Sequence, residues 1–143
     1  MQHVVCFALK LIHVRTTSLA GKHCVQELYK ADANLLNDGE FIGQTLREAA
    51  VAASATILDV SVHAFPKQGV TAFILLAESH ISFHSWPEHG YAAIDVFTCG
   101  DTTEPEKACE LLASKFRARS QHIITLDRYI PEYISKPKNL VLL

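Results

Sequence analysis

The hydrophobic residues of this chain recur at two spacings, and each spacing predicts one kind of element. A spacing of two predicts strands, because alternate side chains of a strand point to opposite faces of a sheet. Strands are predicted over residues 22–29, 56–65, 70–77, 80–86, 91–98 and 121–129. Residues 70–77 are apolar at nearly every position, so we expect a central strand that is covered on both faces. Residues 87–90 form a turn and should join their flanking strands into a hairpin.

A spacing of three and four residues predicts two helices. The first covers residues 40–54, with an apolar stripe of Ile42, Leu46, Ala49, Ala50 and Ala53. The second begins within residues 101–104, behind an Asp/Thr cap, and its stripe contains Ala108, Leu111, Leu112 and Phe116. The order β-α-β-β-β-β-α-β has runs of adjacent strands and only two helices. It predicts an α+β fold, a two-layer sandwich of an antiparallel β-sheet with helices on one face.

The composition is typical of one globular domain spanning residues 1–143. The chain is 49% hydrophobic and 20% charged, and no linker or repeat divides it. We expect residues 1–20 to be an N-terminal extension and residues 21–130 to form the catalytic core. The apolar run 4–12 is too short to span a bilayer and lacks signal-peptide features, so we expect no membrane partner. A net charge of −2 without a basic face argues against nucleic acid.

The cysteines argue for a reducing compartment. Cys6, Cys24, Cys99 and Cys109 show neither a CxxC pair nor a zinc-binding spacing. Free thiols fit this pattern better than a disulfide framework, and they persist in reducing compartments. We therefore expect a cytoplasmic protein.

The residues with chemical potential are concentrated in the stretch 78–100. It contains the Glu78-Ser79 bond, three of the eight histidines, the only tryptophan, and Cys99 directly before Gly100. A serine held against the preceding carbonyl can convert its peptide bond into an ester, and β-elimination then cuts the chain between residues 78 and 79. Hydrolysis leaves a pyruvoyl group, an electrophile that forms a Schiff base with a substrate amine. Such a rearrangement needs a strained corner, a group that polarises the carbonyl, and a base.

Simpler interpretations of the same residues exist. Ser79 is equally compatible with an ordinary turn, and Cys99 by itself would be an inert thiol. His80 and His84 share a strand face by their spacing, which is compatible with a metal site. His89 lies in the turn, however, and nothing matches a zinc pattern, so we expect no metal.

The same stretch resembles a known family. Its fixed positions read E-S-H-x-x-x-H-x-W-P-E-x-G-Y-A-A-x-D-x-F-T-C-G. This is similar to the stretch around the processing serine of the S-adenosylmethionine decarboxylase proenzymes, in their short bacterial and archaeal form. The resemblance covers residues 69–100, and a weaker likeness extends upstream through residues 21–23, 27–28 and 63–65. Residues 1 to about 18, and those after about 130, lie outside it.

The resemblance implies roles in processing and catalysis. Ser79 would become the pyruvoyl group, with self-cleavage between Glu78 and Ser79. His84 would take a proton during processing. Cys99 would return a proton to the substrate α-carbon after CO₂ leaves.

The resemblance also implies substrate-binding and helper residues. Glu88 would hold the ribose hydroxyls, and Phe65 would stack on adenine, as an aromatic face can. The family's helper serine in processing corresponds to Thr71 here. Because threonine keeps the hydroxyl but adds a methyl group, we expect slower self-cleavage.

The implied activity is pyruvoyl-dependent decarboxylation of S-adenosylmethionine. The product is the aminopropyl donor for the synthesis of spermidine and other polyamines. Two alternatives stay open. One is a decarboxylase of the same family that acts on another amino acid such as arginine, and the other is an uncleaved, inactive homologue with a regulatory role. Intact Ser79, His84 and Cys99 argue against the second alternative.

The spacing of Ser79 and His84 predicts a dimer. The two residues are five positions apart, so a regular strand would point them to opposite faces and hold them roughly 16 Å apart. His84 should therefore not reach Ser79 of its own chain. We expect a homodimer in which Ser79 and Cys99 of one chain meet four residues of the other, namely Thr71, His84, Phe65 and Glu88.

Overall fold

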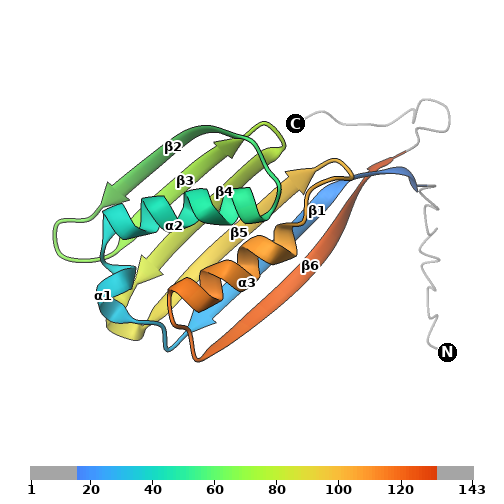
Figure 1. The fold of residues 1–143 in the computed structure, drawn as a ribbon. Coiled ribbons are helices and arrows are strands. Elements are labelled where there is room, and N and C mark those ends of the chain that lie inside the picture. The colour runs from blue at the N-terminus through green and yellow to red at the C-terminus, as the bar shows by residue number, and fades with distance from the viewer. Residues whose placement is uncertain (1–15, 132–143) are drawn as a thin grey trace, which may run out of the picture.

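The computed structural model describes residues 16–131, which form one antiparallel sheet with helices packed against one of its faces (Figure 1). The elements in chain order are β1 Thr16–Tyr29, α1 Ala33–Leu36, α2 Gly39–Ala52, β2 Ile57–Ala64, β3 Val70–Leu76, β4 Ser79–Trp86, the 3₁₀ turn η1 Pro87–His89, β5 Tyr91–Cys99, α3 Pro105–Lys115 and β6 Ser120–Pro131. The strand order is β2-β3-β4-β5-β1-β6. The predicted two-layer α+β sandwich is confirmed.

The structure refines several predicted boundaries. β1 begins at Thr16, earlier than the strand expected from residue 22. The connection between β1 and α2 contains the short helix α1, because the Asp32 side chain accepts hydrogen bonds from the Asn34 and Leu35 backbone N–H groups and caps it. Helix α3 follows Glu104, which makes no side-chain capping bond, so the expected Asp/Thr cap is wrong. The apolar run 4–12 and the tail 132–143 lie outside the described residues.

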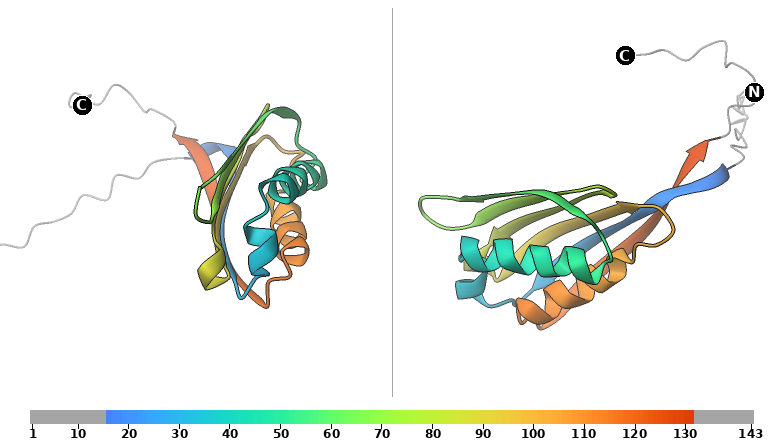
Figure 2. Two further views of the ribbon diagram at one scale, coloured as in Figure 1. Left: turned by 90° about the vertical axis from the view of Figure 1, so that its left-hand side faces the viewer. Right: turned by 45° about the horizontal axis from the view of Figure 1, so that its top comes forward.

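The hydrophobic core lies between the sheet and the helices (Figure 2). The Phe116 ring, at the end of α3, stacks on Phe83 of β4 with ring centroids 5.0 Å apart. The same ring meets Phe41 of α2 edge to face at 5.6 Å. Cys109 of α3 is fully buried in this core. These contacts join both helices to the central strand β4, which is the strand that carries Ser79 and His84.

The face of the sheet opposite the helices is open in the single chain, and we call it the open face. Along β3, alternate residues are buried, while Phe73 and Leu75 are 41% and 44% exposed. The prediction that residues 70–77 are covered on both faces is therefore wrong for one chain. The physical reason is that both helices pack against the same face, so every second apolar side chain of β3 points away from them.

The register of β4 sets the geometry of everything described below. The predicted hairpin of β4 and β5 is confirmed, with Trp86 opposite Tyr91 at its turn. At the other end of the hairpin, Ser79 lies opposite Thr98. On its second side β4 pairs with β3, where His84 lies opposite Thr71. Ser79 and His84 consequently lie toward opposite ends of one strand.

Gly21 allows β1 to approach the end of β5. A Cβ atom on Gly21 would lie 2.3 Å from the Thr98 carbonyl oxygen and 2.9 Å from the Cys99 Cα atom. Both neighbours are backbone atoms of a paired strand, so neither can move without displacing β5. A side chain at position 21 would therefore disturb the segment that carries Cys99.

We predict that Gly21→Ala lowers the free energy of unfolding by about 2 kcal/mol, the usual cost of overpacking. Gly39→Ala is the matched control, because its Cβ would lie 3.4 Å from a Val62 methyl group, an ordinary contact. We expect the control to change stability by less than about 0.5 kcal/mol. Urea unfolding followed by circular dichroism measures both values. Equal stability of the two variants would show that β5 adapts to the added methyl group.

Candidate active site

Ser79 lies at a strained corner of the backbone. Ala77 and Glu78 form the two-residue turn between β3 and β4, and Ser79 follows with a φ angle of +142°. L-amino acids rarely adopt this region, and holding one there costs on the order of 1–3 kcal/mol. The corner therefore has the strain that a rearrangement of the Glu78-Ser79 peptide bond requires.

The carbonyl group of that peptide bond is polarised by a backbone donor. The Cys99 N–H donates a hydrogen bond to the Glu78 carbonyl oxygen, with the two heavy atoms 2.7 Å apart. A donor in this position would stabilise negative charge developing on the oxygen when a nucleophile attacks the carbonyl carbon. This donor could not be predicted from the sequence, because a backbone contact leaves no signature in the residue type.

The Glu78 side chain anchors the corner from the opposite direction. The Thr56 N–H donates to Glu78 Oε2 at 2.8 Å, and the Ala77 N–H donates to the Thr56 carbonyl oxygen at 2.9 Å. The hydrogen bond from Thr56 lowers the pKa of the Glu78 carboxyl, because it stabilises the charged form. The turn is thus hydrogen-bonded to the loop that follows α2, while the Glu78 carbonyl group is hydrogen-bonded to β5.

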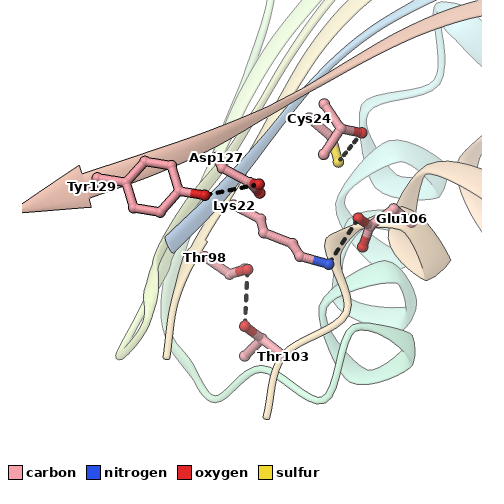
Figure 3. A network of polar contacts seen from close by, with 8 residues as sticks. Lys22, Cys24, Thr98, Thr103, Glu106, Asp127 and Tyr129 are labelled. Carbon is pink, nitrogen blue, oxygen red and sulfur yellow. Dashed lines mark hydrogen bonds and ion pairs between the residues drawn. The ribbon is translucent and has the colours of Figure 1, made fainter. Parts of the chain in front are cut away.

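The end of β5 is itself held in place. The Thr103 hydroxyl donates to Thr98 Oγ1 at 2.9 Å (Figure 3). It also approaches the Cys99 carbonyl oxygen at 3.4 Å. Beside it, Lys22 of β1 pairs with Glu106 of α3 at 3.3 Å (Figure 3). These contacts fix the backbone from which the Cys99 N–H projects. Cys99 itself is exposed.

Four of the predicted residues gather at the other end of β4, around a cavity of about 340 Å³. The cavity is lined by Phe65, Gln68, Gly69, Thr71, His84, Ser85, Trp86 and Glu88. Thr71 Oγ1 and His84 Nδ1 are 3.0 Å apart, so the two side chains share a hydrogen bond. Phe65 is half exposed, which leaves its ring face free for stacking.

The floor of this cavity is built by buried hydrogen bonds. The Ser85 hydroxyl donates to the Leu36 carbonyl oxygen at 2.7 Å and accepts from the Val70 N–H at 2.9 Å. The Gly69 N–H donates to the Asn37 side chain at 2.8 Å. Gly69 has a φ angle of +92°, and a Cβ atom there would lie 3.0 Å from the Ser85 carbonyl oxygen. Ser85 and Asn37 were not predicted as site residues. The signal that could have identified Ser85 was a polar side chain at a position where the strand pattern predicts burial.

The structure divides the predicted residues into two clusters. Ser79, Glu78 and Cys99 form the processing corner, while Thr71, His84, Phe65 and Glu88 line the cavity. The five-residue separation along β4 corresponds to roughly 16 Å in an extended strand. One chain therefore does not bring Ser79 and His84 together. The separation of Ser79 from His84 within one chain is the one predicted from their spacing in the sequence.

Residues 16–131 contain neither a metal-binding cluster nor a helix that could span a membrane. No group of three or more His, Cys, Asp or Glu side chains in this part of the chain is arranged to hold a metal ion. Among the same residues, none of the helices has the length and apolar character needed to cross a membrane.

The fold and the two clusters define a two-layer α+β protein with a strained serine corner and a separate cavity at the far end of β4. A family model described as S-adenosylmethionine decarboxylase matches residues 22–129. The chain therefore belongs to the S-adenosylmethionine decarboxylase family.

Individual relatives agree with this assignment. An S-adenosylmethionine decarboxylase proenzyme of Prochlorococcus marinus (strain MIT 9313) is 51% identical over 113 residues, which cover 79% of this chain and 90% of the relative. A proenzyme of Halalkalibacterium halodurans is 41% identical, over 85% of this chain and 97% of its own. The crystal structure of the Aquifex aeolicus adenosylmethionine decarboxylase superposes with a TM-score of 0.75 at 33% identity, covering 85% of this chain and all of that one.

The Glu78 anchor predicts a pH dependence at the corner. Because the folded-state pKa of Glu78 is lowered, its bond to Thr56 stabilises the corner above the ordinary glutamate pKa of about 4.3 and is lost as the pH falls through the lowered value. In an uncut Ser79→Ala chain, the NMR shift of the Thr56 amide should titrate with a midpoint below about 4.3. Glu78→Gln should abolish this titration. A midpoint at or above the ordinary value would contradict the anchor.

Proposed function

We propose that this chain is a self-processing, pyruvoyl-dependent decarboxylase that converts S-adenosylmethionine to its decarboxylated form, the aminopropyl donor for spermidine and other polyamines. The observation that carries the proposal is the strained Ser79 corner, whose carbonyl oxygen accepts a 2.7 Å hydrogen bond from the Cys99 N–H. The family assignment supplies the substrate, because the relatives are named S-adenosylmethionine decarboxylase proenzymes.

The corner fits a pyruvoyl group because Ser79 supplies its carbon atoms, and water supplies the ketone oxygen when the dehydroalanine left by β-elimination is hydrolysed with loss of ammonia. Ser79 Oγ attacks the Glu78 carbonyl carbon. The hydrogen bond from the Cys99 N–H stabilises the negative charge that develops on the carbonyl oxygen. The attack also releases the backbone strain at Ser79. β-Elimination then cuts the chain between residues 78 and 79. A pyruvoyl group supplies an electrophilic carbonyl that withdraws electrons from the substrate α-carbon when CO₂ leaves.

The two clusters divide the remaining tasks. The Glu88 carboxylate can accept hydrogen bonds from ribose hydroxyls, and the half-exposed Phe65 ring can stack on adenine or face the sulfonium cation. The Cys99 thiol would return a proton to the α-carbon, a role supported by the exposure of Cys99 and its position next to the corner. Of the processing residues, His84 would remove the α-proton of Ser79, and Thr71 holds its ring by the 3.0 Å hydrogen bond.

The alternatives considered from the sequence are not favoured. Relatives that match most of this chain at up to about half identity are named for S-adenosylmethionine, which argues against arginine as the substrate. They are also named proenzymes, which argues against an uncleaved regulatory homologue. A cytoplasmic location stays a prediction, supported by the free thiols of Cys24, Cys99 and Cys109.

Completion of the site requires a second chain, and the open face suggests how it binds. Large apolar side chains are exposed there, including Phe73, Leu75 and Trp86. Contiguous exposed apolar surface of this kind commonly marks a protein interface. If two open faces stack on one another, a twofold axis that lies between them and runs across the strands would reverse the strand direction of the partner. The Ser79 end of one β4 would then face the His84 end of the other, and both sites would be identical.

Self-cleavage would change the mass of the purified chain. Denaturing mass spectrometry should show two pieces, residues 1–78 and residues 79–143, the second with a blocked, carbonyl-bearing N-terminus. Cys99→Ala should still be cut, because the donor to the Glu78 carbonyl is its backbone N–H, but decarboxylation should fall by about 100-fold.

Ser79→Ala is the control, and it should remain a single 143-residue chain. A folded Cys99→Ala chain that is not cut would show that the backbone donor is insufficient. A wild-type chain that stays intact after long incubation would favour the inactive homologue.

Hybrid dimers would test whether each site combines two chains. Ser79→Ala and His84→Ala chains, co-expressed with different tags, should form hybrids in which one of the two sites has both residues. Because that site combines Ser79 of one chain with His84 of the other, the cut chain should be the one that carries His84→Ala. His84→Ala expressed alone should stay intact. No cutting in the purified hybrid would show that His84 acts within its own chain.

A further inference from the structure

The residue beside Ser79 has no role in the scheme so far, although its side chain lies against the Ser79 hydroxyl. His80 Nδ1 lies 3.1 Å from Ser79 Oγ, within hydrogen-bonding distance. Neighbouring side chains of a regular strand point to opposite faces. The positive φ angle of Ser79 breaks this alternation at the first residue of β4 and allows the two side chains to meet.

The His80 ring is also held in a fixed orientation. It stacks on Phe73 of β3, with centroids 5.3 Å apart and the planes 20° from parallel. On the other side it meets Phe97 of β5 edge to face at 6.1 Å. Two aromatic contacts on neighbouring strands leave the imidazole little freedom to rotate away from the serine. A base held in this way needs no rearrangement before it acts.

From this geometry we propose that His80 is the base that activates Ser79 in the first step of self-processing. The inference rests on the proposed function and deepens it, because it assigns the proton acceptor for the serine hydroxyl within the same chain. His84 is too distant for this task in one chain, and the proposed role of His84 belongs to the later removal of the α-proton. Two histidines would then act on two different protons.

The step is balanced without any external reagent. The Ser79 hydroxyl proton moves to unprotonated His80 Nδ1 as Oγ forms a bond to the Glu78 carbonyl carbon. The carbonyl oxygen gains the negative charge and is held by the Cys99 N–H at 2.7 Å. The imidazolium then returns the proton to the nitrogen of residue 79, and the carbon–nitrogen bond breaks. The products are an ester at Glu78 and a free amine on residue 79.

Other histidines of the described chain are less suited to this role. His23 Nε2 pairs with Asp95 at 3.0 Å, and its Nδ1 faces Arg128 at 3.5 Å. His84 Nδ1 pairs with Thr71 at the far end of β4. Among the described histidines, the hydrogen bonds place only His80 against the Ser79 hydroxyl.

Two substitutions separate a base from a packing residue. His80→Phe keeps an aromatic ring between Phe73 and Phe97 but removes the nitrogen. His80→Asn keeps a hydrogen-bond acceptor for Ser79 but cannot take a proton at neutral pH. If His80 acts as a base, both variants should be cut about 100-fold more slowly than wild type. If His80 served only for packing, His80→Phe would be cut at the wild-type rate. If His80 served only to orient the Ser79 hydroxyl, His80→Asn would be cut at the wild-type rate.

The experiment follows the full chain from its synthesis. Cell-free translation of wild type, His80→Phe and His80→Asn is sampled over time, and the conversion of the intact chain to its two pieces is measured by mass spectrometry. Hydroxylamine, which cleaves esters but not ordinary peptide bonds at neutral pH, is added to parallel samples. His84→Ala is the matched control, because a chain stopped after the first step should be cleaved by hydroxylamine between residues 78 and 79.

The expected result is that both His80 variants stay intact and resist hydroxylamine, because no ester has formed. Cutting of either variant at the wild-type rate would overturn the proposal, and so would hydroxylamine cleavage to the extent seen with His84→Ala. Circular dichroism on the same variants confirms that they are folded. A wild-type chain that is never cut would instead contradict the proposed function, so the two failures are distinguishable.

Discussion

The pairing of β4 with β5 is the constraint on which the site depends. Its register places Ser79 opposite Thr98, so the next backbone N–H, that of Cys99, meets the Glu78 carbonyl group. A slip of one residue would change the face of every side chain in the strand and remove this contact. The close approach of Gly21 and the hydrogen bond of Thr103 hold the end of β5 in the same position. The reactive corner is therefore a product of sheet geometry as much as of its own residues.

The second constraint is that the helices cover only one face of the sheet. The buried face is filled by the core, and the chemically useful side chains of β3, β4 and β5 are left on the open face. Because β4 is a straight, paired strand, its two ends cannot fold back on one another. A site that needs both ends has to combine two chains. This physical limit is the reason that the proposed function and the proposed dimer are inseparable.

The sequence predicted the fold well because its hydrophobic spacing differs clearly between strands and helices. The β4–β5 hairpin and both long helices were found from this pattern, and so was the separation of Ser79 from His84. Coverage of β3 was misjudged, because an uninterrupted apolar run looks the same whether the second cover is a helix or a partner chain. The Cys99 N–H and the His80 contact were missed, since they depend on backbone positions and on the φ angle of Ser79.

The position of the proposed cut within the strand order has one more consequence. Of the described strands, residues 1–78 contribute β1, β2 and β3, whereas residues 79–143 contribute β4, β5 and β6. In the order β2-β3-β4-β5-β1-β6, the two segments are interleaved, with β1 lying between β5 and β6. Separation of the two pieces would break the ladders β3–β4, β5–β1 and β1–β6 together. The backbone can thus be cut at the strained Ser79 corner while hydrogen bonds across the break hold the sheet together as one cooperative unit.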